Sequence, residues 1–210
     1  MPWESGFPIA RNPIDFFVHR TLREHGLRPS PEATPAELVR RLSLDLNGLP
    51  ASVIGVDGFL DRGTVGALVD RLLASPRFGE TFAVPWMDAA RYGDSCAMHA
   101  DYERFLWPWR LYVVDAYNQN MPFDQFTVEQ FAGDLLPGAT SMQRLASAFN
   151  RHHPSSNEDG SIPEELRVEY VADRVHTTAT VWLGLTMDCA RCHDHKYDQI
   201  SQEDYYRFFA

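Results

Sequence analysis

The stretch of sequence that decides the fold is residues 161–184, SIPEELRVEYVADRVHTTATVWLG. Ser161, Pro163 and Glu164 have the spacing of a capping box, with a proline at the first helical position. They predict the start of a long helix over roughly residues 163–184. This helix leads directly into a pair of cysteines. The helix that decides the fold and the most specific chemical signature of the chain are therefore adjacent in the sequence.

The signature after this helix consists of Cys189, Cys192 and His193 in the order C-x-x-C-H. This pattern is the attachment signature of a c-type haem. Two thiols at this spacing can add to the two vinyl groups on one edge of the porphyrin, and the adjacent histidine then lies under the iron as its proximal ligand. The sequence therefore predicts haem c bound through Cys189, Cys192 and His193.

Other chemistries can use the same residues. Cys189, Cys192, His193 and His195 are four ligands of the kinds that tetrahedral zinc prefers. The two cysteines could instead close a small disulfide loop. A dithiol redox pair normally accompanies a βαβ unit, which the surrounding sequence does not indicate. Zinc and a disulfide therefore stay open as alternatives to haem.

A second axial ligand for the iron would have to come from outside the motif, because His195 is too close in sequence to reach the far face of the haem. His176 is the first candidate, since it precedes Cys189 by 13 residues on the predicted long helix. The further candidates are His152, His153, His99, Met98 and Met187. The predicted metal-binding histidines are His193 and His176 for haem iron, and His195 as well in the zinc alternative.

Composition limits the class of protein. The chain has 210 residues, 44% of them hydrophobic and 12% aromatic, which is enough for a substantial core. Its formal net charge of -10 argues against a nucleic-acid partner, which would require a basic surface. No apolar run reaches the length of about 18 residues that a transmembrane helix requires.

The rest of the chain also predicts helices. Apolar spacing, caps and breakers place them at the following positions: from Pro13 to about Gly26, from Pro35 to Asn47, around 68–73, from about Gly79 to Arg91, 107–118, from about 123 to Gly133, and 141–149. Polar loops are expected at 92–106 and 150–162, and Cys96 is expected to be a small buried residue. We expect a mainly α, irregular multi-helix domain over 13–210 with few or no strands, after an N-terminal segment of residues 1–12.

Several phrases of the sequence occur together in a known family. They are RLSLDLNGLP at 41–50, LVDRLLASP at 68–76, ARY at 90–92, AGDLLP at 132–137, EELR at 164–167, DRV at 173–175 with Thr177 and Thr178, and LGLT at 183–186 running into CARCHDHKYD at 189–198. The chain from residue 13 to 210 resembles a bacterial family of unknown function that is abundant in planctomycetes. Two positions depart from the family pattern: His176, where asparagine or another small polar residue is expected, and Gln199, where proline is expected.

The resemblance implies a location and a context. Members are usually large exported proteins, often with a planctomycete-type cytochrome c domain before this region and a second uncharacterised domain after it. It implies that this chain is an internal piece of such a protein in the periplasm or cell envelope, with a haem or redox role and a redox partner protein or flanking cytochrome domain. The resemblance supplies no reaction.

Two functions of other classes remain as rivals. One is a structural zinc or scaffold module in a large envelope protein involved in polysaccharide breakdown. The other is a hydrolase that uses acidic loop residues near 94–101 and 157–164, for which the sequence offers no nucleophile and base at a recognisable spacing.

Overall fold

The structure, a computed structural model, describes residues 12–52, 63–98, 100–156 and 158–210. Within these ranges every regular element is a helix, and one isolated antiparallel bridge joins Ser95 to Glu103. The predicted mainly α fold is therefore confirmed. Residues 1–11 of the predicted N-terminal segment and the candidate ligand His99 lie outside the described residues. The division into an N-terminal segment and one domain stays a prediction.

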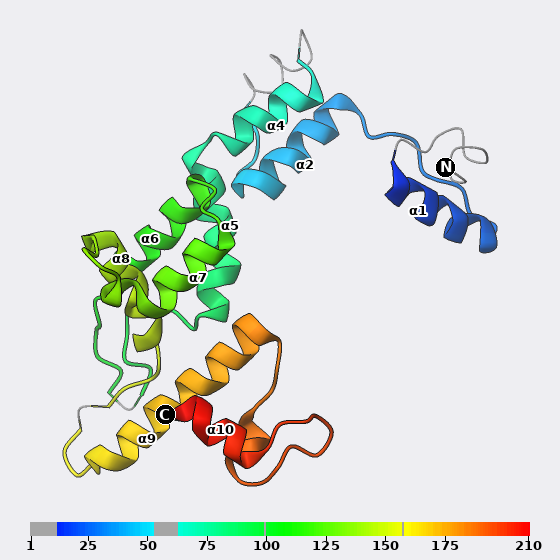
Figure 1. Ribbon diagram of the computed structural model, residues 1–210. Coiled ribbons are helices and arrows are strands. Elements are labelled where there is room, and N and C mark those ends of the chain that lie inside the picture. The colour runs from blue at the N-terminus through cyan, green and yellow to red at the C-terminus, as the bar shows by residue number, and fades with distance from the viewer. Residues whose placement is uncertain (1–11, 53–62, 99, 157) are drawn as a thin grey trace.

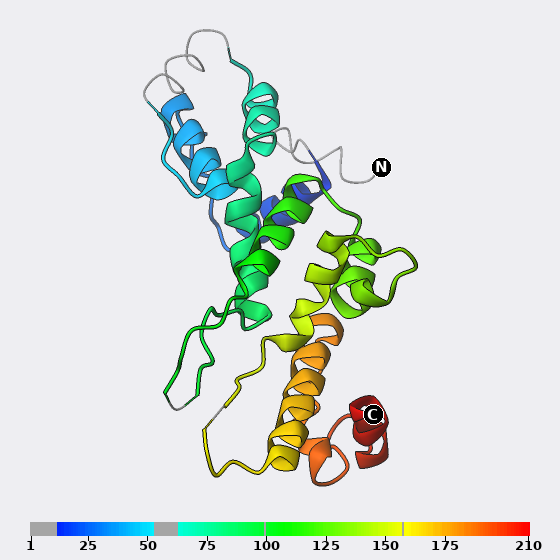
Figure 2. The same cartoon turned by 90° about the vertical axis from the view of Figure 1, so that its left-hand side faces the viewer.

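The helices form three groups along an elongated molecule (Figure 1). Helix α1 (Pro13–Glu24) stands apart, and α2 (Pro35–Asn47) pairs with α4 (Val65–Leu73). The middle group contains α5 (Pro76–Ala89), α6 (Trp107–Asn118), α7 (Phe123–Ala132), η1 (Gly133–Leu135), α8 (Ser141–Ala146) and η2 (Ser147–Arg151). The last group contains α9 (Pro163–Thr178), the π-helical turn η3 (Ala179–Leu183), the 3₁₀ turn η4 (Asp188–Arg191) and α10 (Gln202–Phe209). Figure 2 shows that α9 begins at the bottom of the molecule and runs up to the middle group, with α10 beside it.

Local signals set several helix boundaries as predicted. Asn12 caps α1, and its side chain accepts hydrogen bonds from Ile14 N and Asp15 N. Thr34 and Glu37 form the expected capping box of α2, and Gly48 ends that helix in the left-handed conformation. Helix α6 has the predicted bounds.

Two predicted boundaries in the middle group are wrong. Helix α5 begins at Pro76 rather than near Gly79, because Ser75 caps the helix and Pro76 suits its first position. The helix predicted over 141–149 is divided, since α8 ends at Ala146 and the chain continues as the 3₁₀ turn η2.

The long C-terminal helix also differs from the prediction. The α-helical part ends at Thr178, the next five residues widen into a π-turn, and Gly184 ends it in the left-handed conformation with φ 64°. The predicted capping box is absent: Ile162 is the N-cap residue, Ser161 Oγ donates to Glu158 O, and Glu164 accepts from Arg167 instead.

The core of the middle group surrounds Trp109, which is 1% exposed and whose Nε1 donates to Ala146 O at 3.1 Å. It joins α5, α6, α7 and α8 through mostly aromatic contacts. A second cluster connects α9, η4 and α10, and a third connects α2 and α4. Cys96 is 4% exposed, as expected for a small buried residue.

Helices α5 and α6 approach closely at Gly79, where an added Cβ would lie 2.3 Å from Val114 O. Asn118 on α6 holds the first turn of α5, because its Oδ1 accepts from Gly79 N at 2.8 Å and its Nδ2 donates to Pro76 O at 3.2 Å.

We expect Asn118→Ala to lower the free energy of unfolding by about 1–2 kcal/mol, measured by urea denaturation. Gln119→Ala is the control, since Gln119 follows α6 and its Nε2 donates only to Asp115 on the last turn of the same helix. Equal effects of the two substitutions would contradict this role.

Candidate functional site

Buried residues in and next to the C-x-x-C-H segment anchor it to the core, whereas its cysteines are exposed. Met187 is 6% exposed and Ala190 is fully buried, and both pack with Val175 and Tyr205. The cysteines at 189 and 192 are exposed free thiols. Because side chains three residues apart eclipse each other in a 3₁₀ turn, the two thiols project from one side of η4 while Met187 and Ala190 project from another.

His193 is exposed and has a defined tautomer. Its Nδ1 lies 2.8 Å from the carbonyl oxygen of Asp194. A carbonyl only accepts hydrogen bonds, so Nδ1 must carry the proton and donate it. In the neutral ring the lone pair is then on Nε2, which is the form in which histidine binds a metal through Nε2.

His195 has the opposite tautomer. Its Nδ1 accepts the N–H of Asp198 at 2.9 Å and faces the N–H of Tyr197 at 3.4 Å. Asp198 Oδ2 is also 3.2 Å away, but two converging N–H groups require a lone pair on Nδ1. Neutral His195 therefore carries its proton on Nε2, and its side chain is only 10% exposed. His195 closes a turn and offers no free lone pair to a metal.

His176 lies beside the motif. Its Nδ1 is 2.7 Å from Oδ2 of Asp188, the residue directly before Cys189, and its side chain is 45% exposed. Helix α9 therefore brings the first predicted extra ligand next to η4. Its role as an iron ligand stays a prediction.

A shell of contacts that the sequence did not indicate fixes the backbone of the motif. Arg191 forms a bidentate pair with Glu169 of α9, and this hydrogen-bonded pair raises the pKa of Arg191 and lowers that of Glu169. Gln202 Nε2 and Tyr206 Oη, both on α10, donate to the carbonyl oxygen of Arg191 at 3.1 Å. Gln202 N donates to Asp194 Oδ1 at 2.8 Å. Helices α9 and α10 thus hold the residues on either side of Cys192 and His193.

The four residues of the zinc alternative do not form a metal site in this structure. Across the ranges that the structure describes, no three or more histidine, cysteine, aspartate or glutamate side chains are arranged to hold a metal ion. The tautomer of His195 gives a physical reason, because its accepting nitrogen is already occupied by backbone N–H groups.

Residues 13–210 match the model of a family described as PSCyt2, protein of unknown function (DUF1549). The chain belongs to this family. No curated protein and no solved structure matched it. The PSCyt2 region contains the whole C-x-x-C-H segment together with α9 and α10, which hold it.

The other candidate ligands of this PSCyt2 chain lie in different surroundings. His152 is 2% exposed and packs on Trp109, and His153 stacks on Tyr170 with ring centroids 4.3 Å apart. Met187 is buried beneath η4. No helix within the described residues is long and apolar enough to cross a membrane.

Proposed function

We propose that this chain is a haem-c-binding domain of an exported redox protein. Cys189 and Cys192 would hold the haem through thioethers, and His193 would ligate the iron. One observation supports this assignment over zinc: His193 keeps a free Nε2 lone pair, whereas His195 does not.

The residues of the motif fit the chemistry that attachment requires. Each thiol would add across one haem vinyl group, forming a C–S bond, and the thiol hydrogen would pass to the neighbouring vinyl carbon. Both thiols are free and exposed, three residues apart at η4. When bound, haem supplies a centre that takes up and releases one electron.

The protein would orient the His193 ring toward the iron and provide apolar side chains next to the porphyrin. The bond from His193 Nδ1 to Asp194 O fixes the tautomer and the orientation of the ring. Leu183, Leu185 and Tyr197 flank the motif in sequence and are 55%, 37% and 83% exposed. Exposed apolar side chains of this kind are suited to covering a porphyrin.

Location and partners follow as parts of the same proposal. Thioether attachment of haem c takes place outside the cytoplasmic membrane, so we place the domain in the periplasm or cell envelope. A redox partner protein or a flanking cytochrome domain would exchange electrons with it. The resemblance to large exported proteins supports this context.

The test is co-expression of an exported form with a cytochrome c maturation system, followed by haem staining on a denaturing gel and a pyridine haemochrome spectrum. We expect covalent haem in the unmodified protein and its loss in Cys192→Ser. Cys96→Ser is the control, because Cys96 is buried apart from the motif and should leave the stain unchanged. A stable but colourless protein would refute the proposal, and metal analysis with about one zinc per chain would favour the zinc alternative.

A further inference from the structure

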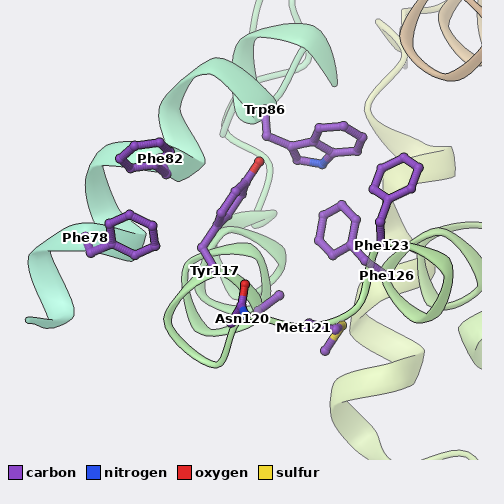
Figure 3. A pocket seen from close by; sticks show the side chains of 9 residues that line it. Phe78, Phe82, Trp86, Tyr117, Asn120, Met121, Phe123 and Phe126 are labelled. Carbon is purple, nitrogen blue, oxygen red and sulfur yellow. The ribbon is translucent and has the colours of Figure 1, made fainter. Parts of the chain in front are cut away.

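An aromatic groove opens between α5, α6 and the start of α7 (Figure 3). Its cavity of about 280 Å³ is lined mainly by Phe78, Phe82, Trp86, Tyr117, Phe123 and Phe126. Phe82 is 37% exposed and Phe123 is 66% exposed. We refer to this surface as the aromatic groove. Phe126 forms its buried floor, and Phe78, Trp86 and Tyr117 are half-buried. A concave aromatic surface with exposed phenylalanines at its edge is typical of an interaction site.

Phe78, Phe82 and Trp86 follow one another four residues apart on α5, so they form a single stripe along that helix. The stripe is about 12 Å long at 1.5 Å per residue. The only side-chain amide in the lining belongs to Asn120, and no charged side chain lines the cavity. The groove therefore suits an apolar occupant of about this length.

Helix α1 carries an apolar stripe of matching length. Ile14, Phe17 and Val18 are 72%, 58% and 51% exposed, and Leu22 continues the same face at helical spacing. None of the residues of α1 is buried. From Ile14 to Leu22 this stripe also extends about 12 Å. Anchors at these spacings are those that a helix uses when it docks in an apolar groove.

Charge also favours this pairing. Residues 13–28 carry Arg20, Arg23 and Arg28 against two carboxylates, so this segment is slightly basic. The helices that form the aromatic groove are acidic, because α5, α6 and α7 contain four carboxylates outside the core, besides the buried Glu129, and only two arginines. Opposite local charge around two docking surfaces helps to fix the register of their contact.

The connection between α1 and α2 favours docking on another molecule. The end of α2 that touches α5 is its C-terminus, where a Cβ on Gly48 would lie 2.9 Å from Thr81 Oγ1. Helix α1 is attached at the opposite end of α2, about 20 Å away. The connecting residues 26–33 include Pro29 and Pro31, which favour an extended chain, and α1 lies away from α5, α6 and α7 (Figure 1).

We propose that α1 of one copy docks its apolar stripe in the aromatic groove of a second copy, and that the second copy reciprocates. The symmetric dimer would form the contact twice, which doubles the buried surface. This arrangement covers the two exposed apolar surfaces with each other. It does not depend on haem attachment.

The test is the mass in solution of the whole chain, measured by size-exclusion chromatography with light scattering at several concentrations. We expect a dimer for the unmodified protein. Phe17→Asp in the stripe and Phe82→Asp in the groove should each weaken dimerisation by at least about tenfold, because each places a charge in an apolar contact. Val84→Asp is the control, since Val84 is 48% exposed on the opposite side of α5 and should leave the dimer intact.

A mixture of the two variants tests whether α1 and the groove bind each other. Phe17→Asp keeps an intact groove and Phe82→Asp keeps an intact α1, so the mixture should form heterodimers through one remaining contact. Phe123→Asp, a second groove variant, should behave like Phe82→Asp and preserves the start of α7, where an acidic residue is favourable. An unmodified protein that is monomeric at every concentration would overturn the proposal. A mixture no more associated than either variant alone would overturn the reciprocal contact.

Discussion

Replacing His193 by asparagine in the haem-loaded protein should abolish the histidine-ligated absorption spectrum, whereas the same replacement at His195 should preserve it. Asparagine at position 193 can still donate its amide N–H to Asp194 O, as Nδ1 of the histidine does, but it has no counterpart of Nε2. At position 195 the amide oxygen of asparagine can accept the Asp198 N–H in place of Nδ1. The two substitutions therefore retain the turns, and only His193→Asn removes the nitrogen that we propose as the iron ligand.

The measurement is the visible spectrum of the oxidised and reduced protein together with the haem content per chain. His195→Asn is the matched control for His193→Asn, because the two positions are two residues apart and receive the same side chain. A spectrum that survives in His193→Asn, or one that is lost equally in both variants, would show that His193 is not the ligand.

The fold was largely predictable where its signals are local. Asn12, Thr34 and Glu37 satisfy backbone groups within three residues of themselves, so their capping roles can be read from the sequence alone. The bounds of α6 follow from Pro108 at its start and the polar residues after Asn118. The predicted capping box at 161–164 failed because Arg167 competes for Glu164.

The sequence identified the residues of the candidate site, but it could not predict how their side chains are arranged. The spacing of Cys189, Cys192 and His193 is a property of the sequence, but the tautomers of His193 and His195 depend on which backbone groups the fold brings to each ring. The contact between Arg191 and Glu169 joins residues 22 positions apart on different elements. No periodic pattern signals such a contact before the helices are packed.

His152 should make the protein lose stability in mild acid. It is 2% exposed, its Nδ1 donates to Ala90 O across 3.2 Å, and Trp109 lies against its ring. Burial, aided by the nearby cations of Arg91 and Arg104, lowers its pKa from 6.5 to about 3. In the unfolded chain the imidazole of His152 is therefore protonated below about pH 6.5. In the folded protein it stays neutral down to about pH 3.

Stability is consequently lost as the pH falls through this window. Between pH 7 and about pH 4, His152 alone should lower the free energy of unfolding by about 3 kcal/mol. The measurement is urea denaturation across this range for the unmodified protein and for His152→Phe, which retains an aromatic ring and cannot be protonated. The variant should be less stable at pH 7, because it loses the bond to Ala90, but its stability should fall less on acidification.

Phe149→Leu provides the matched control, because Phe149 contacts the same ring with centroids 6.3 Å apart and carries no titratable group. This substitution should lower the free energy of unfolding by a similar amount at each pH, since it removes packing and no proton-binding site. Burial also lowers the pKa of the adjacent His153, so a residual acid sensitivity is expected in His152→Phe. If His152→Phe keeps the full pH dependence of the unmodified protein, the buried imidazole of His152 is not its source.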